Sequence, residues 1–171
     1  MSLALAALCL AALSGAATAA PRLEQWPQEW RDEQGRPLVL GDLAGHRVVL
    51  TMAYAACRRI CPTTIGELKR AQQRLDARGE RAEFVIVGYD PDSEDAATWR
   101  QYRASHHLDR QNWHFLSGPR EATEQFARQF GFDFWKYDEH VMHGSRVLLF
   151  DARGTLTAEF GPETPDWAAA F

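Results

Sequence analysis

The sequence predicts an α/β domain with a central mixed β-sheet, flanking helices and a C-terminal β-hairpin. Short apolar runs, typical of strands buried on both faces, alternate with longer segments whose apolar residues recur at helical spacing. Near the carboxyl end, two segments alternate apolar and polar residues on either side of a turn. About 150 residues follow the leader described below, which is enough for one domain with one core.

The predicted elements follow one another with short connections. Pro62 is acceptable in the first turn of a helix, and Gly131 is suited to end one. A polar stretch with Trp26 and Trp30 precedes the first strand, and we expect it to lie as an arm across the domain. The expected order is strand 46–54, helix 62–78, strand 82–89, helix 96–106, strand 112–116, helix 121–130 and a hairpin of strands 145–150 and 155–160.

Residues 1–20 are predicted to be a secretory signal peptide. They carry no charged side chain, are rich in Ala and Leu, and end in small residues of the kind that signal peptidases cleave. An uncleaved membrane anchor is the alternative, because the apolar stretch is nearly long enough to span a bilayer. In either case residues 21–171 form a single exported domain, which predicts a periplasmic location in an oxidising compartment.

The charge balance restricts the partners. The chain has 19 Lys and Arg against 23 Asp and Glu, a formal charge of -4. This balance argues against nucleic acid as a partner and predicts no electrostatic attraction to a membrane surface.

Cys57 and Cys61 are the only cysteines after the leader, and they lie where a strand leads into a helix. Thiols at a helix N-terminus have lowered pKa values, and Arg58 and Arg59 add positive charge. Two close thiolates can form a disulfide, exchange with another disulfide or bind a soft metal. They are too few for a Cys₄ cluster, but together with one imidazole they would suit Cu(I). A static disulfide is the alternative.

His140 and His143 are the candidate imidazoles. We expect both in the loop that enters the first strand of the terminal hairpin, where a solvated surface histidine is the alternative. Met142, between them, could supply a thioether ligand, but a core-filling role is expected.

Four segments of the chain resemble the Sco/SenC family of copper-delivery proteins. Residues 54–64 resemble its Y-T-x-C-x-x-x-C-P signature, and residues 88–95 its S-x-D-P-x-x-D-T stretch. Residues 112–118 resemble W-x-x-L-T-G, and residues 143–151 resemble H-S-x-x-x-x-L-x-D. The matching features span roughly residues 36–160 in the family's order. This resemblance implies a thioredoxin-like fold.

The resemblance also implies a copper site. Cys57, Cys61 and His143 fall on the family's copper ligands, whereas His140 does not match a ligand position. Asp90 falls on the acidic loop that faces the site, where it would support the ligands.

The chain departs from the family pattern in several places. Arg58 replaces a proline that many members have, and Gly144 separates His143 from Ser145. The tail after Phe160 is shorter than the family's usual final helix, which suggests truncation. No departure removes a ligand, but Gly144 could shift the position of His143.

By this resemblance the protein is expected to be a periplasmic copper metallochaperone rather than an enzyme. Reduced Cys57 and Cys61 with His143 would hold a copper ion as Cu(I) and pass it to a copper centre of a terminal cytochrome c oxidase. The expected partners are the copper-bearing subunit of that oxidase and a thiol reductase that keeps the two cysteines reduced.

Two other functions remain open. In a thiol–disulfide oxidoreductase, Cys57 would attack and Cys61 would resolve the mixed disulfide. Against it, the spacing is C-x-x-x-C rather than C-x-x-C, and no proline lies in the loop at His143. The third possibility is an interaction domain with a structural disulfide. Replacing His143 should separate the first two, because only copper binding needs the imidazole.

Overall fold

Strands β3 (Arg47–Ala53) and β4 (Ala82–Gly88) form the centre of a five-stranded mixed sheet in the computed structural model, which describes residues 20–57, 60–138, 140–164 and 166–171. The strand order is β5-β4-β3-β8-β9. The outer strands are β5 (Trp113–Leu116), β8 (Val147–Phe150) and β9 (Leu156–Phe160). Strands β3, β4 and β5 are parallel, whereas β8 and β9 run antiparallel to their neighbours, so the sheet is mixed as predicted.

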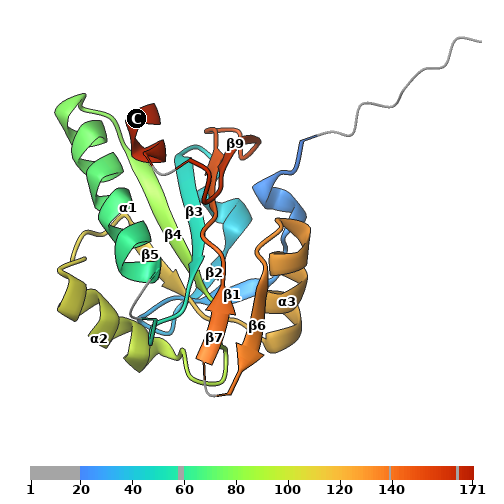
Figure 1. The fold of residues 1–171 in the computed structure, drawn as a ribbon. Coiled ribbons are helices and arrows are strands. Elements are labelled where there is room, and N and C mark those ends of the chain that lie inside the picture. Colours follow the sequence, from blue (N-terminus) through green and yellow to red (C-terminus); the bar gives the residue numbers. More distant parts are fainter. Residues whose placement is uncertain (1–19, 58–59, 139, 165) are drawn as a thin grey trace, which may run out of the picture.

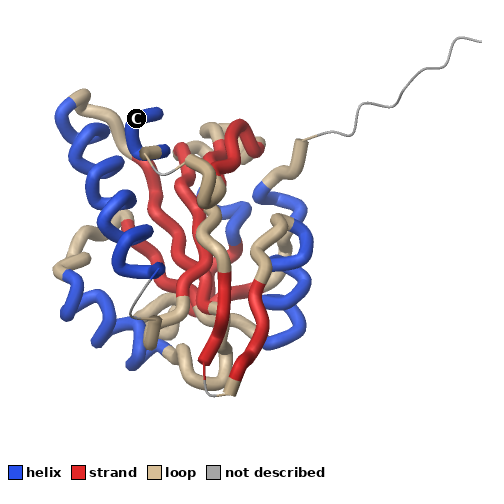
Figure 2. Tube along the Cα trace, viewed as in Figure 1, coloured by secondary structure: helices blue, strands red, loops and turns tan. Residues whose placement is uncertain are grey.

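The two central strands are almost wholly buried because helices cover both faces of the sheet (Figure 1). Helices α1 (Ile60–Ala77) and α2 (Ala96–His106) lie on one side and α3 (Arg120–Gln129) lies on the other. Both α1 and α2 connect parallel strands that step in the same direction, and right-handed crossovers then place them on one face. Figure 2 shows the strands as a layer between helices. The predicted α/β class is therefore confirmed.

The N-terminal segment packs across the domain, as expected, and also contributes to the core. Strand β1 (Glu29–Arg31) pairs with β2 (Pro37–Val39) in a small antiparallel sheet. Trp30 of β1 is fully buried and packs against α3, with its ring centroid 5.8 Å from that of Phe126. Two short 3-10 turns, η1 (Leu23–Gln25) and η2 (Leu40–Leu43), flank this pair of strands.

The prediction that His140 and His143 lie in a loop is wrong, because these residues form a strand. Strand β7 (His140–His143) pairs with β6 (Phe134–Tyr137) in a separate antiparallel hairpin beside the main sheet. The strands are only four residues long and β6 is mostly exposed, so neither shows the apolar run by which buried strands are recognised.

The C-terminal segment closes the amino end of the sheet. The 3-10 turn η3 (Trp167–Ala170) packs against α1, and Trp167 and Phe171 are buried. No helix among the described residues is long and apolar enough to cross a membrane. The predicted signal peptide lies almost entirely outside the described residues.

Candidate metal centre

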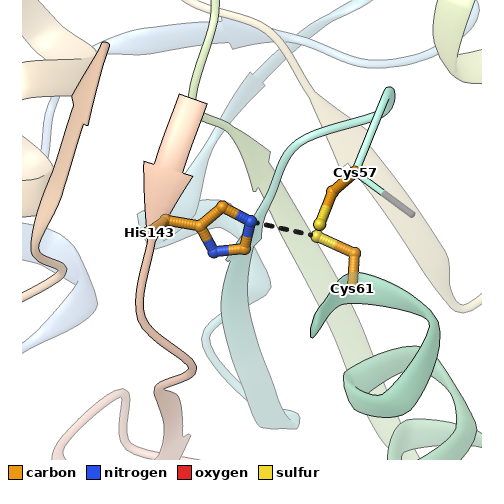
Figure 3. Close-up of side chains that lie close together, drawn as sticks. All are labelled: Cys57, Cys61 and His143. Atoms are coloured by element: carbon orange, nitrogen blue, oxygen red, sulfur yellow. Dashed lines mark hydrogen bonds between the residues drawn. The ribbon is translucent and has the colours of Figure 1, made fainter. Parts of the chain in front are cut away.

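The two cysteines and His143 come from three different elements that meet at one edge of the sheet (Figure 3). Cys57 lies in the loop that follows β3, Cys61 lies in the first turn of α1, and His143 is the last residue of β7. This edge holds the carboxyl ends of the parallel strands β3 and β4, where α/β sheets commonly place their ligand sites.

The structure brings the three sequence-predicted ligands together. The two sulfur atoms and a ring nitrogen of His143 all lie within 4.8 Å of one another. Sγ of Cys61 is 3.4 Å from Nε2 of His143. Cys61 and His143 are buried, whereas Cys57 is half-buried. This is the one group of three or more Cys, His, Asp and Glu side chains with metal-ligand spacing in the part of the chain that the structure describes.

The ring of His143 is held so that Nε2 faces the sulfur atoms. Its Nδ1 lies 2.8 Å from the carbonyl oxygen of Gly144, and the ring stacks on Tyr89 with 4.7 Å between centroids. An Nδ1–H that donates to a carbonyl leaves the Nε2 lone pair available, which is the usual arrangement of a metal-binding histidine. Gly144, the residue that departs from the family pattern, therefore supplies the oxygen that orients His143.

The expected lowering of the thiol pKa is wrong for Cys61. A hydrogen bond with Cys57 and burial raise the pKa of the Cys61 thiol well above its usual value, although the backbone N–H of Tyr54 donates to its sulfur at 3.4 Å. Burial of the sulfur removes the water that would stabilise a thiolate. Cys61 is therefore a thiol at neutral pH. Arg58 and Arg59, expected to add positive charge, lie outside the described residues.

Asp90 lies in the loop after β4, and its carboxylate contacts residues other than the three ligands. Its carboxylate accepts a hydrogen bond from Oγ of Ser93 (2.8 Å) and pairs with Nζ of Lys136 (3.1 Å). Burial raises the pKa of Asp90, but Ser93 and Lys136 outweigh this and hold it below its usual value. Because Lys136 belongs to β6, Asp90 links the loop after β4 to the hairpin that carries His143. A supporting role for Asp90 stays a prediction.

Glu94 is a residue near the site that sequence reasoning missed. It is buried, and its two carboxylate oxygens accept the backbone N–H groups of Ala55 (2.6 Å) and Asp90 (2.8 Å). It thereby ties the loop before Cys57 to the loop after β4. The next residue, Asp95, caps α2 by accepting the backbone N–H of Thr98, so the two neighbouring acidic residues have different roles. The close approach of Gly88, where any Cβ would overlap the Glu94 carboxylate, could not be read from spacing.

The buried carboxyl group of Glu94 should make the stability of the folded domain depend on pH. Burial raises the pKa of the Glu94 carboxyl to about 8, whereas a glutamate in the unfolded chain has its usual pKa of about 4.5. The native state then holds the proton more tightly, so this contribution to stability is present below pH about 4.5 and is lost as pH rises through about 8. The loss should be on the order of a few kcal/mol at most, at about 1.4 kcal/mol per unit of pKa.

The matched variant is Glu94→Gln, which does not titrate. It should be less stable by about 1–3 kcal/mol at low pH, because an amide leaves one backbone N–H unpaired. The difference from the parent should shrink as pH rises. Urea unfolding of both proteins across this range checks the prediction, and parallel stability curves would contradict it.

An open pocket gives solvent access to the half-buried cysteine. Since Cys57 forms part of its wall, a molecule that enters the pocket can reach the Cys57 sulfur while Cys61 and His143 remain covered. The pocket is lined by Tyr54, Ala55, Ala56, Cys57, Pro62, His106 and His140.

The donor set fits Cu(I) better than harder ions. Thiolate sulfur is a soft ligand that Cu(I) favours, and imidazole is compatible with it. The carboxylates of Asp90 and Glu94 are engaged by the contacts described above, so they do not add hard oxygen ligands. Zinc usually takes four protein ligands in a structural site, one more than this group offers.

The sequence of this domain matches a known family over nearly its full length. The sequence model of the SCO1/SenC family matches residues 17–170. The chain belongs to the Sco/SenC family. The resemblance noted from four separate motifs is thus confirmed.

Individual relatives of this Sco/SenC protein agree with that assignment. A protein of Stutzerimonas stutzeri named for copper binding is 27% identical over 143 residues, which cover 80% of this chain and 69% of that one. Yeast Sco1 with copper bound has a TM-score of 0.72 at 18% identity, covering 84% and 82% of the two chains. BsSco, described as a Sco-family cytochrome c oxidase assembly protein with a disulfide switch, has a TM-score of 0.72 at 22% identity, covering 83% and 84%. These structures share the thioredoxin-like fold.

Proposed function

We propose that this Sco/SenC protein is a periplasmic copper metallochaperone, in which Cys57, Cys61 and His143 hold Cu(I) as cargo for a terminal oxidase. One observation carries the proposal: two thiols and an oriented imidazole lie within 4.8 Å of one another. Membership of the family and the copper named for its relatives support the choice of metal.

The three donors have different roles in holding and releasing the cargo. Cys61 and His143 are buried and would retain the ion, while Cys57 is half-buried beside the open pocket. A ligand from a recipient protein entering that pocket would displace the Cys57 sulfur first. Transfer would then proceed by ligand exchange, without release of the ion to water.

The proposed function requires two partners, a protein that receives the copper and a reductase that keeps the cysteines reduced. BsSco is described as a member of a family of cytochrome c oxidase assembly proteins, and this favours a copper-bearing oxidase subunit as the recipient here. A reductase is required chemically, because two adjacent thiols in an oxidising compartment lose two electrons and two protons to form a disulfide. A dithiol reductase would reverse this by thiol–disulfide exchange.

The experiment that tests the proposal measures Cu(I) binding without oxygen. The reduced protein competes with a chromophoric chelator, and one tight equivalent is expected. The loaded protein is then mixed with the apo copper-bearing subunit of the oxidase, the two are separated, and the copper content of each is measured, which should show that the ion has moved to that subunit. Weak binding would contradict the proposed copper site. Tight binding without transfer would contradict only the proposed recipient.

Copper affinity should rise with pH. The raised pKa of Cys61 keeps its sulfur protonated at neutral pH, so binding must release that proton. Each proton released makes the apparent affinity about tenfold tighter per pH unit. Repeating the chelator competition at several pH values, corrected for the chelator's own protonation, checks this. An affinity that does not change with pH would contradict a protonated Cys61.

A thiol–disulfide oxidoreductase is the second candidate. The observation that favours it is the hydrogen bond between the thiols of Cys57 and Cys61, which places the two sulfurs side by side (Figure 3). The more accessible Cys57 would attack a substrate disulfide, and Cys61 would resolve the mixed disulfide, so the substrate gains two electrons and two protons. Reduction of a disulfide substrate that is unaffected by loss of His143 would favour this function.

A further inference from the structure

The β6–β7 hairpin presents a second set of soft donors on its outward face. Alternation along a strand places His140 and Met142 on one face and His143 on the other. Met142 pairs with Trp135 on the neighbouring strand, and His140 pairs with Tyr137. The face opposite to the one that carries His143 is therefore made of an imidazole, a thioether and two aromatic rings.

This face is exposed. The exposed fractions are 57% for Trp135, 67% for Tyr137 and 44% for Met142, and His140 is also exposed. These three are the only large apolar side chains so exposed in the described ranges. The expected core-filling role of Met142 is therefore wrong. Apolar side chains gathered in water commonly mark a binding site.

We propose that His140 and Met142 form a second Cu(I) site on this face. Imidazole and thioether are ligands that accept soft cations, and residues two apart on a strand lie about 7 Å apart, within the combined reach of these side chains. The indole of Trp135, opposite Met142, can stabilise a cation near its ring face. Asp138, exposed at the hairpin turn, adds negative charge. With no thiolate, this site binds more weakly than the cysteine centre.

The second site lies where it could acquire copper for the cysteine centre. Met142 is adjacent in sequence to His143, and His140 lines the open pocket that also exposes Cys57. An ion acquired by His140 and Met142 is thus next to the entrance of the cysteine centre, and moves by ligand exchange to the stronger thiolate donors. This acquisition role rests on the proposed function, whereas binding at the outer face does not.

The test follows the methionine methyl groups by NMR. The chain has three methionines, of which Met52 is buried in β3 and Met142 is exposed. Reduced protein labelled at the methionine methyls is titrated with Cu(I) without oxygen. The signal of Met142 should shift as an equivalent binds beyond the first, while that of Met52 stays in place. Met142→Leu, which keeps the apolar volume, should lose this equivalent and retain the first.

Two further variants make the test specific. His140→Asn should also lose the second equivalent, whereas His46→Ala, at an exposed histidine before β3, should retain both. An unmoved Met142 signal, or unchanged binding by Met142→Leu, would overturn the second site and leave the face as a surface for protein contact. If the Met142 signal shifts but no thiolate-bound equivalent forms, the second site stands and the proposed function fails.

Discussion

Replacing His143 with alanine should weaken Cu(I) binding by more than about 100-fold, since even residues that only orient a metal ligand typically cost 10–100-fold when mutated. The imidazole is held by Gly144 and Tyr89 with Nε2 3.4 Å from the Cys61 sulfur, so no other described side chain replaces it at the centre. Chelator competition on the reduced proteins measures the change, which corresponds to more than about 2.7 kcal/mol.

His46→Ala is the matched control for this measurement. His46 is exposed and precedes β3, whereas Cys57 follows the other end of that seven-residue strand, roughly 20 Å away. Loss of the His46 imidazole should leave the affinity of the protein for Cu(I) unchanged. An affinity in His143→Ala equal to that of the parent would rule out the three-ligand centre. If that variant also exchanged disulfides at the parental rate, the oxidoreductase function would become the better account.

Replacing Trp30 with alanine should destabilise the domain by about 3–5 kcal/mol, the usual loss for a large buried aromatic side chain. Trp30 is fully buried, packs edge-on against Phe126 of α3 and fills the space over Gly118. The segment that carries it was expected only as an arm. Urea unfolding of the two proteins measures the difference in the free energy of unfolding.

Trp135→Ala is the matched control for Trp30. The side chain of Trp135 is largely exposed, so its removal should change stability by no more than about 0.5 kcal/mol. Gly118→Ala tests the same packing from the other side, because its Cβ would overlap the Trp30 ring. If Trp30→Ala and Trp135→Ala unfold at the same urea concentration, the N-terminal segment is not part of the core.

The central sheet could be predicted because its signals are local. Strands 46–54 and 82–89 are continuous apolar runs, and the structure places β3 and β4 within them. The hairpin of β8 and β9 follows from alternation around residues 151–154. The spacing of the two cysteines and their position after a strand also indicated the metal centre, since both features depend on residues that are close together in the chain.

The resemblance to the Sco/SenC motifs already favoured His143 over His140 as a ligand, but only the tertiary structure shows on which side of β7 these two residues and Met142 lie. Three neighbouring residues with similar donor chemistry differ only in which side of β7 they occupy. That side is set by the pairing of β7 with β6, and a shift of one residue would exchange the inward and outward faces. The four residues of β7 do not specify this register, because the two apolar ones, Val141 and Met142, are neighbours that point to opposite faces.

Sequence alone thus determined the sheet, the order of its elements and the two cysteines, because each depends on residues close together in the chain. Only the tertiary structure placed His143 beside the sulfurs, buried Trp30 and engaged Glu94 with the loop before Cys57. These contacts join residues 39 or more positions apart. These contacts depend on which strands pair and how the helices pack. The free energy that favours one such arrangement over others comes from many contacts throughout the core.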